Sequence, residues 1–206
     1  MTEGLAGALR AIAGALLAPV MVILLLLLAA AVFLLGSLLV EFFTERRRLR
    51  ARLPELADAL RRENADIPAV LRDSGLLRRQ RNALLEVTAH PTLTPAMREA
   101  LAVRLIRRER EHYEGAVRLS DGIAKLGPMF GLLGTLIPLG PGIIALGRGD
   151  TYTLSLSLLT AFDTTIAGLI AAALAFVISM IRKRWYAGYM ATLEMIMECV
   201  LAVSDD

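Results

Sequence analysis

One carboxylate, Asp163, interrupts an otherwise uncharged run between Thr151 and Ile181. An ionisable side chain within such a run costs ~3 kcal/mol to place in hydrocarbon, so it normally faces a bundle interior or water and marks a path for ions. Asp163 also lies ~28 Å along a helix from Arg182, which nearly spans a bilayer core. The alternative is a carboxylate near the outer headgroups that is either hydrated or paired with Arg148.

Four hydroxyl side chains accompany this carboxylate. Thr160 and Thr164 flank it at helical spacing, while Thr165 and the earlier Thr135 lie at mid-depth in two neighbouring apolar runs. A threonine in a span usually donates to its own helix one turn back. It does not ionise at physiological pH, but a ring of hydroxyls solvates a proton carrier without trapping the ion. The candidate residues lining an ion path are Thr135, Thr160, Asp163, Thr164 and Thr165.

Small residues recur at three- and four-residue steps along both runs. They let helices approach closely in lipid, where no hydrophobic drive operates between helices. Proline interrupts the backbone hydrogen bonds, so the outer half of the earlier run is predicted to be kinked or broken. The candidate packing or hinge residues are Gly127, Gly131, Gly134, Pro138, Pro141 and Gly168.

Two short motifs carry a resemblance to a known family. GLLGTL begins at Gly131, and AFDTTIAGL begins at Ala161. Together they resemble the MotA/TolQ/ExbB proton channel family, whose ExbB and TolQ members have G-x-x-G-T in the middle helix and A-x-x-x-T-x-x-G-L in the last. The resemblance places Thr135 and Thr165 on the two threonines that line the family's channel interior.

The resemblance also implies an assembly and a function. It implies a ring-shaped homo-oligomer, commonly a homopentamer, around a single-span partner of the ExbD/TolR/MotB type that carries an aspartate. The expected function is that of an ion channel subunit in a stator-like motor complex, which couples the ion-motive force to mechanical work. The resemblance does not specify which process is driven; the options include protein transport, motility and envelope maintenance.

The chain departs from ExbB-like members at three places. They carry an acid five residues before the second threonine, where this chain has Thr160. Asp163 is acidic where the family is usually apolar, and Pro138 and Pro141 stand where proline is not usual. Because of these departures, the sequence does not specify whether the ion is a proton or sodium, or how the channel is gated.

The elements that must position these residues follow from three apolar runs, each exceeding the ~20 residues that a helix needs to cross a bilayer. Three such helices exceed any plausible soluble core, and hydrophobic residues make up 56% of the 206, which suits a polytopic membrane protein. We expect an all-α polytopic membrane protein, with long helices extending from the membrane. The predicted transmembrane helices cover residues 18–43, 125–147 and 153–181, with a short outer loop at 148–152.

Basic residues predict the orientation, because Lys and Arg near span ends stay on the cytoplasmic side. An arginine cluster from Arg46 to Arg52 follows the first span, and Arg182, Lys183 and Arg184 follow the last. The amphipathic lead-in at residues 1–17 should therefore lie outside, and residues 44–124 and 182–206 in the cytoplasm of a cell inner membrane protein. A secretory signal would have a shorter apolar core preceded by basic residues, so we expect the first span to be retained.

The cytoplasmic section is predicted to be helical, with proline and glycine at the boundaries. Helices should begin at Pro54, at Ile67 and at Leu76, the last ending before His90. Thr94 as N-cap with Pro95 behind it predicts a further helix that continues into the membrane. After the last span, residues 185–203 form an amphipathic segment for packing. Arg78, Arg79 and Arg81 form a basic patch that suits anionic lipid headgroups better than nucleic acid.

No residue pattern supports an enzyme, a metal site or a cofactor. The one cysteine, Cys199, is typical of a small apolar filler, and His90 and His112 lack metal-ligand partners at useful spacing. The glycine motifs lack the lysine of a phosphate-binding loop.

Two rival functions remain. One is a non-conducting oligomeric membrane scaffold that recruits partners through its cytoplasmic helices. The other is a small solute transporter, which would require inverted repeats that the two hairpin spans do not show.

Overall fold

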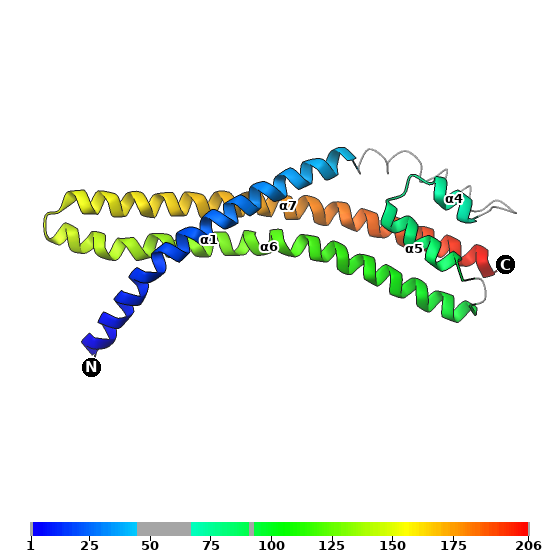
Figure 1. The fold of residues 1–206 in the computed structure, drawn as a ribbon, viewed down its shortest axis with the longest axis horizontal. Helices are drawn as coiled ribbons and strands as arrows, with labels where there is room; N and C mark the ends of the chain where they lie inside the picture. Colours follow the sequence, from blue (N-terminus) through cyan, green and yellow to red (C-terminus); the bar gives the residue numbers. More distant parts are fainter. Residues whose placement is uncertain (1, 45–66, 91–92, 206) are drawn as a thin grey trace. The chain divides into compact units, whose positions relative to one another are not determined.

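The computed structural model describes residues 2–44, 67–90 and 93–205. These residues form five helices and no strand, as the all-α prediction required. Three of the helices are long and apolar enough to cross a membrane. The helices, drawn in Figure 1, are α1 (Thr2–Thr44), α4 (Ile67–Asp73), α5 (Arg78–Thr88), α6 (Pro95–Gly147) and α7 (Thr151–Asp205).

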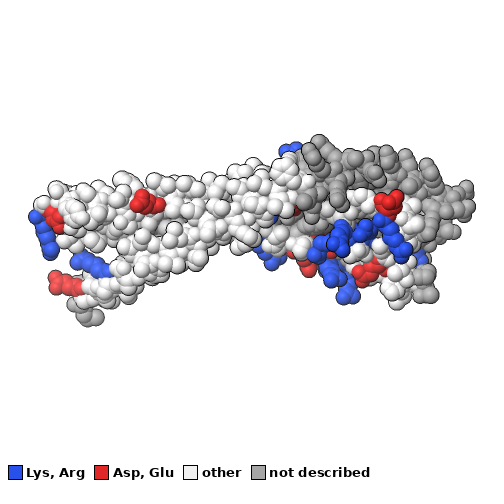
Figure 2. All heavy atoms as spheres, turned by 45° about the horizontal axis from the view of Figure 1, so that its top comes forward, with Lys and Arg blue, Asp and Glu red and all other residues white. Residues whose placement is uncertain are grey.

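The chain divides into two compact units, and the three long helices contribute to both. The first unit contains residues 1–36 and 118–180, and the second contains residues 37–117 and 181–206. Lys and Arg side chains gather on the second unit, whereas the first shows a largely uncharged surface (Figure 2). This division separates the part suited to hydrocarbon from the part suited to water.

In the first unit, α1 contributes one buried stripe. Val20, Leu24, Ala31 and Leu34 are buried at three-, four- and seven-residue steps, which fall on one side of a helix. Its other side exposes large apolar side chains such as Phe33, and the outer halves of α6 and α7 expose many more. An apolar exterior over a partly small-residue interior is the arrangement expected of helices packed within lipid.

In the second unit, α4 and α5 complete a hydrophobic core with the first part of α6, up to residue 117, and the last part of α7, from residue 181. Leu71, Leu84, Leu105 and Leu193 are among its buried residues. Gln80, fully buried, donates from Nε2 to the carbonyl oxygen of Tyr189 at 2.9 Å, which ties α5 to α7. The amphipathic residues 185–203 pack in this core as the continuation of α7.

Local start signals are confirmed where the structure describes them. Pro68 stands in the first turn of α4, and α6 begins at Pro95 with Thr94 Oγ1 accepting from the Met97 amide at 3.4 Å. The helix predicted to begin at Pro54 lies outside the described residues. Helix α6 continues without interruption from residue 95 to the hairpin turn, as the Thr94 signal predicted.

Of the two alternatives predicted for the second half of the apolar run in α6, kinked or broken, the break does not occur. Pro138 and Pro141 both lie inside the continuous helix, as does Pro128. Each proline removes one backbone donor, which a spanning helix tolerates when neighbouring helices and local adjustment satisfy the freed carbonyl. In the hairpin, Pro138 is buried and Pro141 is exposed.

Candidate functional site

A tight turn joins α6 to α7 and sets how the two helices pair. Gly149 has φ +74°, and its amide donates to Leu146 O at 3.0 Å while the Asp150 amide donates to Ala145 O at 3.0 Å. This pair of bonds is a Schellman motif, which needs a left-handed residue that glycine supplies without strain. The chain therefore reverses within three residues.

Asp150 then caps the beginning of α7. Its Oδ1 accepts from the Thr153 amide at 3.0 Å, and its other oxygen accepts from the Thr153 hydroxyl. The side-chain hydrogen bond from Thr153, followed by the backbone one, stabilises the carboxylate and lowers the pKa of Asp150 from its ordinary value. The turn is thus ordered by local bonds at neutral pH.

Glycine allows α6 and α7 to approach closely below this turn. A Cβ added at Gly127 would lie 2.7 Å from Gly168 O, and one added at Gly168 would lie 2.6 Å from Gly127 O. A Cβ at Gly134 would lie 2.5 Å from the Thr164 Cβ, whereas one at Gly131 would meet ordinary contacts of 3.6 Å. The glycines of the two motifs therefore lie where α6 and α7 of the same chain pack against each other.

These contacts also fix the register of the antiparallel pair. Toward the hairpin turn, Gly127 meets Gly168 and Ala172, Gly131 meets Thr165 and Gly168, Gly134 meets Thr164, and Gly142 meets Ser157. In an antiparallel pair, each residue forward on α6 corresponds to one residue back on α7. Since Gly134 lies opposite Thr164, Thr135 lies level with Asp163.

Thr164 is the hydroxyl residue that faces the other helix. It is 5% exposed, and its hydroxyl lies 2.9 Å from Thr160 O and 3.0 Å from Ala161 O, both one turn back on α7. Its methyl and hydroxyl fill the space that Gly134 leaves open. Thr164 thus belongs to the contact between α6 and α7, although the sequence groups it with the residues of an ion path.

Three other hydroxyls remain partly exposed. Thr135 donates to Leu132 O at 2.8 Å, Thr160 to Leu156 O at 3.0 Å, and Thr165 to Ala161 O at 3.0 Å. Each hydroxyl proton is therefore used within its own helix. Each oxygen keeps acceptor capacity, so these side chains can solvate a cation or a protonated group.

Asp163 is exposed on α7. Within the part of the chain that the structure describes, it makes no hydrogen bond or ion pair, so the pairing with Arg148 does not occur there. The Asp163 carboxylate therefore lies on the surface of the first unit, next to the buried Thr164 and level with Thr135.

The structure adds two polar groups that the sequence reasoning missed. In the first unit, the Ser179 hydroxyl donates to Asp121 Oδ1 across the α6–α7 contact, next to the fully buried Ser120. Along α6, Asp121 lies four residues before Lys125, on the side away from the hairpin turn. The sequence signal that could have indicated this polar contact was Ser179, a serine three residues before Arg182.

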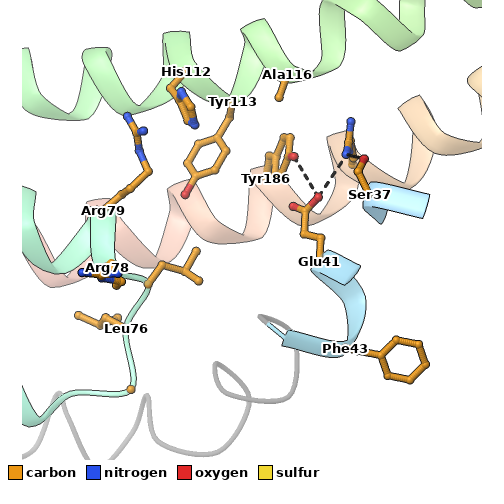
Figure 3. A pocket seen from close by; sticks show the side chains of 13 residues that line it. Ser37, Glu41, Phe43, Leu76, Arg78, Arg79, His112, Tyr113, Ala116 and Tyr186 are labelled. Carbon is orange, nitrogen blue, oxygen red and sulfur yellow. Dashed lines mark hydrogen bonds and ion pairs between the residues drawn. The ribbon is translucent and has the colours of Figure 1, made fainter. Parts of the chain in front are cut away.

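The second missed group is a buried ion pair in the second unit. Arg182, whose side chain is 8% exposed, has Nε 3.4 Å from Glu41 Oε2, and its Nη2 donates to Ser37 Oγ at 2.7 Å. The Tyr186 hydroxyl donates to the same Glu41 oxygen at 3.3 Å (Figure 3). The signal was available in principle, because Glu41 and Arg182 are the first charges after the first and last spans, which end on the same side.

Two comparisons with known proteins bear on this arrangement. Residues 74–195, more than half of the chain, match the model of the MotA/TolQ/ExbB proton channel family. The match includes α5, the hairpin with both threonine motifs and most of the inner part of α7. A search of curated proteins finds no match. Within the described residues, no group of three His, Cys, Asp or Glu side chains could hold a metal ion.

With a family-model match across the paired helices and three helices able to span a membrane, the chain belongs to the MotA/TolQ/ExbB proton channel family.

Proposed function

We propose that the chain is the ion-conducting subunit of a stator-like motor complex, which couples an ion gradient to mechanical work through a single-span partner. The observation that carries the proposal is the exposed carboxylate of Asp163 at the level of Thr135. With Lys125 taken as the inner boundary of the hydrocarbon instead of the more distant Arg182, Thr135 lies ~15 Å from that boundary and ~18 Å from Gly147 along α6, which corresponds to mid-depth in a bilayer core. Hydrocarbon strongly disfavours a carboxylate at that depth, so we infer that Asp163 faces a hydrated lumen.

The hydroxyls give this lumen its chemistry. Thr135, Thr160 and Thr165 direct their protons to their own helices and leave oxygen acceptors partly exposed. Such oxygens stabilise a passing cation or a protonated group without binding it as tightly as a fixed charge would. Thr164 takes a different part, because it keeps α6 and α7 of one chain in register.

The family implies an assembly that closes the lumen. Family members assemble as oligomers with single-span subunits, and we propose a homopentamer surrounding a partner whose aspartate meets Thr135 and Thr165. Protonation would neutralise that aspartate and let it move past an apolar surface. One proton crossing ~100 mV releases ~2.3 kcal/mol, which is available for rotation of the ring against the partner.

The proposed topology has the N-terminus outside and the C-terminus in the cytoplasm. The second unit, with its arginine-rich surface, would then lie on the cytoplasmic side. Its core of α4, α5 and the adjoining parts of α6 and α7 would present a surface to other proteins.

Ion flux in reconstituted vesicles tests the proposal. The chain is co-expressed with its partner, and proton and sodium flux are followed with ion-sensitive dyes under an imposed potential. Thr165→Val and Asp163→Asn together should reduce the flux by about tenfold or more, because each lost polar interaction contributes ~1.5 kcal/mol.

A matched control makes the same change outside the lumen. Thr151→Val removes a hydroxyl at the exposed outer end of α7 and should leave the flux unchanged. Wild-type flux in the Thr165→Val and Asp163→Asn double variant would contradict conduction past these residues. If the oligomer also remained intact without conducting in the wild type, the scaffold function would be favoured instead.

A further inference from the structure

A cavity of about 880 Å³ opens in the second unit and has no part in the proposed ion path. Its walls come from the end of α1, the beginning of α5, the middle of α6 and the α7 residues just after the last span (Figure 3). Glu41 and Arg182 lie in its wall and are the first charges after their spans. The cavity is therefore at the level where α1 and α7 leave the hydrocarbon.

The cavity has a cationic lining. Arg78, Arg79 and Arg182 contribute to it together with His112, and Glu41 is the one carboxylate among the described residues that line it. Glu41 is already paired with Arg182, and Arg79 is paired with Glu109 at 3.1 Å. Arg78 is exposed and makes no hydrogen bond or ion pair with the residues that the structure describes. An anion entering the cavity would therefore meet a cation that no carboxylate of the described residues neutralises.

The backbone at the beginning of α5 adds to the positive electrostatic potential of the cavity. Helix α5 begins at Arg78, and Leu77 before it provides no side-chain cap. The first amides of a helix have no partner within it, and the helix dipole places partial positive charge there. Gly75, Leu76 and Leu77 line the cavity beside Arg78, so this uncapped helix end opens onto it. Helix ends of this kind bind phosphate groups.

Arg182 supplies an independent observation. Its side chain is 8% exposed and lies in the cavity wall, yet its Nε makes no hydrogen bond. The ion pair with Glu41 leaves this donor unsatisfied in a buried setting, which is costly unless an acceptor is supplied. An anion or its hydration shell would supply one.

We propose that this cavity binds the phosphate headgroup of an anionic phospholipid from the cytoplasmic leaflet. The volume is that of a site for a whole small molecule, far larger than a free phosphate needs. Leu76, Tyr113 and Ala116 give part of the lining an apolar character that suits glycerol and the first acyl carbons. The level of the cavity matches the surface at which anionic lipids attract arginine. The proposal concerns lipid binding and does not depend on ion conduction.

The test measures stabilisation of the complete, delipidated protein in detergent. Its thermal midpoint is followed while phosphatidylglycerol or phosphatidylcholine with the same acyl chains is added, and separately with glycerol phosphate and inorganic phosphate. Phosphatidylglycerol should raise the midpoint saturably and the other three should not. Arg78→Gln should require about fivefold more phosphatidylglycerol for half of the effect, because one arginine near an anionic surface contributes roughly that factor.

Arg104→Gln is the matched control. Arg104 is exposed on α6, does not line the cavity, and its replacement changes the net charge equally. It should leave the lipid response unchanged. An equal loss in Arg104→Gln, equal protection by phosphatidylcholine, or full protection by inorganic phosphate would overturn the proposal. Native mass spectrometry counts retained phosphatidylglycerol per chain, and unchanged retention in Arg78→Gln would overturn it independently of stability.

Discussion

Asp150 orders the hairpin turn through the Thr153 amide and hydroxyl, and both bonds require an acceptor at residue 150. We expect Asp150→Ala to increase the exchange rate of the Thr153 amide hydrogen, because the first turn of α7 loses its cap. Asp150→Asn keeps an acceptor oxygen and should stay near the wild type. Hydrogen exchange of the protein in detergent micelles measures both, and equal rates in all three proteins would contradict the capping role.

The same residue predicts a pH dependence. The hydrogen bonds from Thr153 lower the pKa of Asp150 in the folded protein below the ordinary 3.8. A lowered folded pKa means that the stabilisation is complete above the unfolded pKa and is lost as pH falls through the folded one. Protection of the Thr153 amide, relative to an unstructured peptide, should therefore fall only below pH 3.8. Asp150→Asn should show no such transition.

The sequence could nominate Thr164 and Thr165 but could not assign their different surroundings. Both occur on neighbouring stripes of small residues, and helical periodicity treats either stripe as a possible interface. The contact of Gly134 with Thr164 distinguishes them, because it fixes the rotation of α7 against α6. That rotation depends on packing across the hairpin, which a single sequence does not contain.

At the scale of the helices, the glycine contact between α6 and α7 predicts a sharp difference between two similar variants. Gly168→Ala would place a Cβ 2.6 Å from the backbone oxygen of Gly127, which cannot move without shifting α6. We expect a loss of about 1–3 kcal/mol from this overpacking. Gly131→Ala meets nothing closer than 3.6 Å and gains helix propensity, so its stability should equal or exceed that of the wild type.

Thermal or denaturant unfolding in one detergent compares the two variants directly. The control is built in, because both changes add one methyl group to the same helix contact. If Gly131→Ala destabilised the protein as much as Gly168→Ala, the register of the hairpin described above would be wrong.

The buried ion pair between α1 and α7 yields a second prediction at this scale. Glu41→Gln leaves the Arg182 cation in its buried position without a counter-charge, and removing one partner of such a pair costs about 3–5 kcal/mol. Replacing both, as Glu41→Leu with Arg182→Met, should cost less than the single change. The exposed pair of Arg110 and Glu194 is the control, and Glu194→Gln should cost about 1 kcal/mol or less. Additive effects in the Glu41 and Arg182 double variant would contradict the coupling.

Helix boundaries were predictable where they depend on local chemistry. The starts at Ile67 and Pro95 were predicted from proline at the first turn and from a threonine N-cap, and both are present. The sequence could not choose between a kink and a break at Pro138, because the effect of a proline depends on what surrounds the helix, and the helix is continuous there. A lone helix in water has no neighbour to stabilise a proline-containing turn, whereas a packed spanning helix does.

At the scale of the whole molecule, the first unit has a polar feature that a single chain does not cover. Asp163 is exposed on α7, and Thr135, Thr160 and Thr165 are only partly buried. In a monomer surrounded by lipid the carboxylate would cost ~3 kcal/mol. Association of several copies around a hydrated lumen removes that cost, so the protein should be stable as an oligomer.

The mass of the purified protein tests this argument. Native mass spectrometry should show a homo-oligomer, five copies by family resemblance, and co-expression should add a single-span partner. Thr165→Val should retain the full assembly while conduction falls, since Thr165 contributes acceptor chemistry and its hydroxyl bonds only its own helix. Asp163→Leu removes the cost of exposing a carboxylate to lipid, so it should raise the fraction of monomer at low protein concentration. A wild-type protein that stayed monomeric at every concentration, with or without the partner, would contradict both the lumen and the function proposed for it.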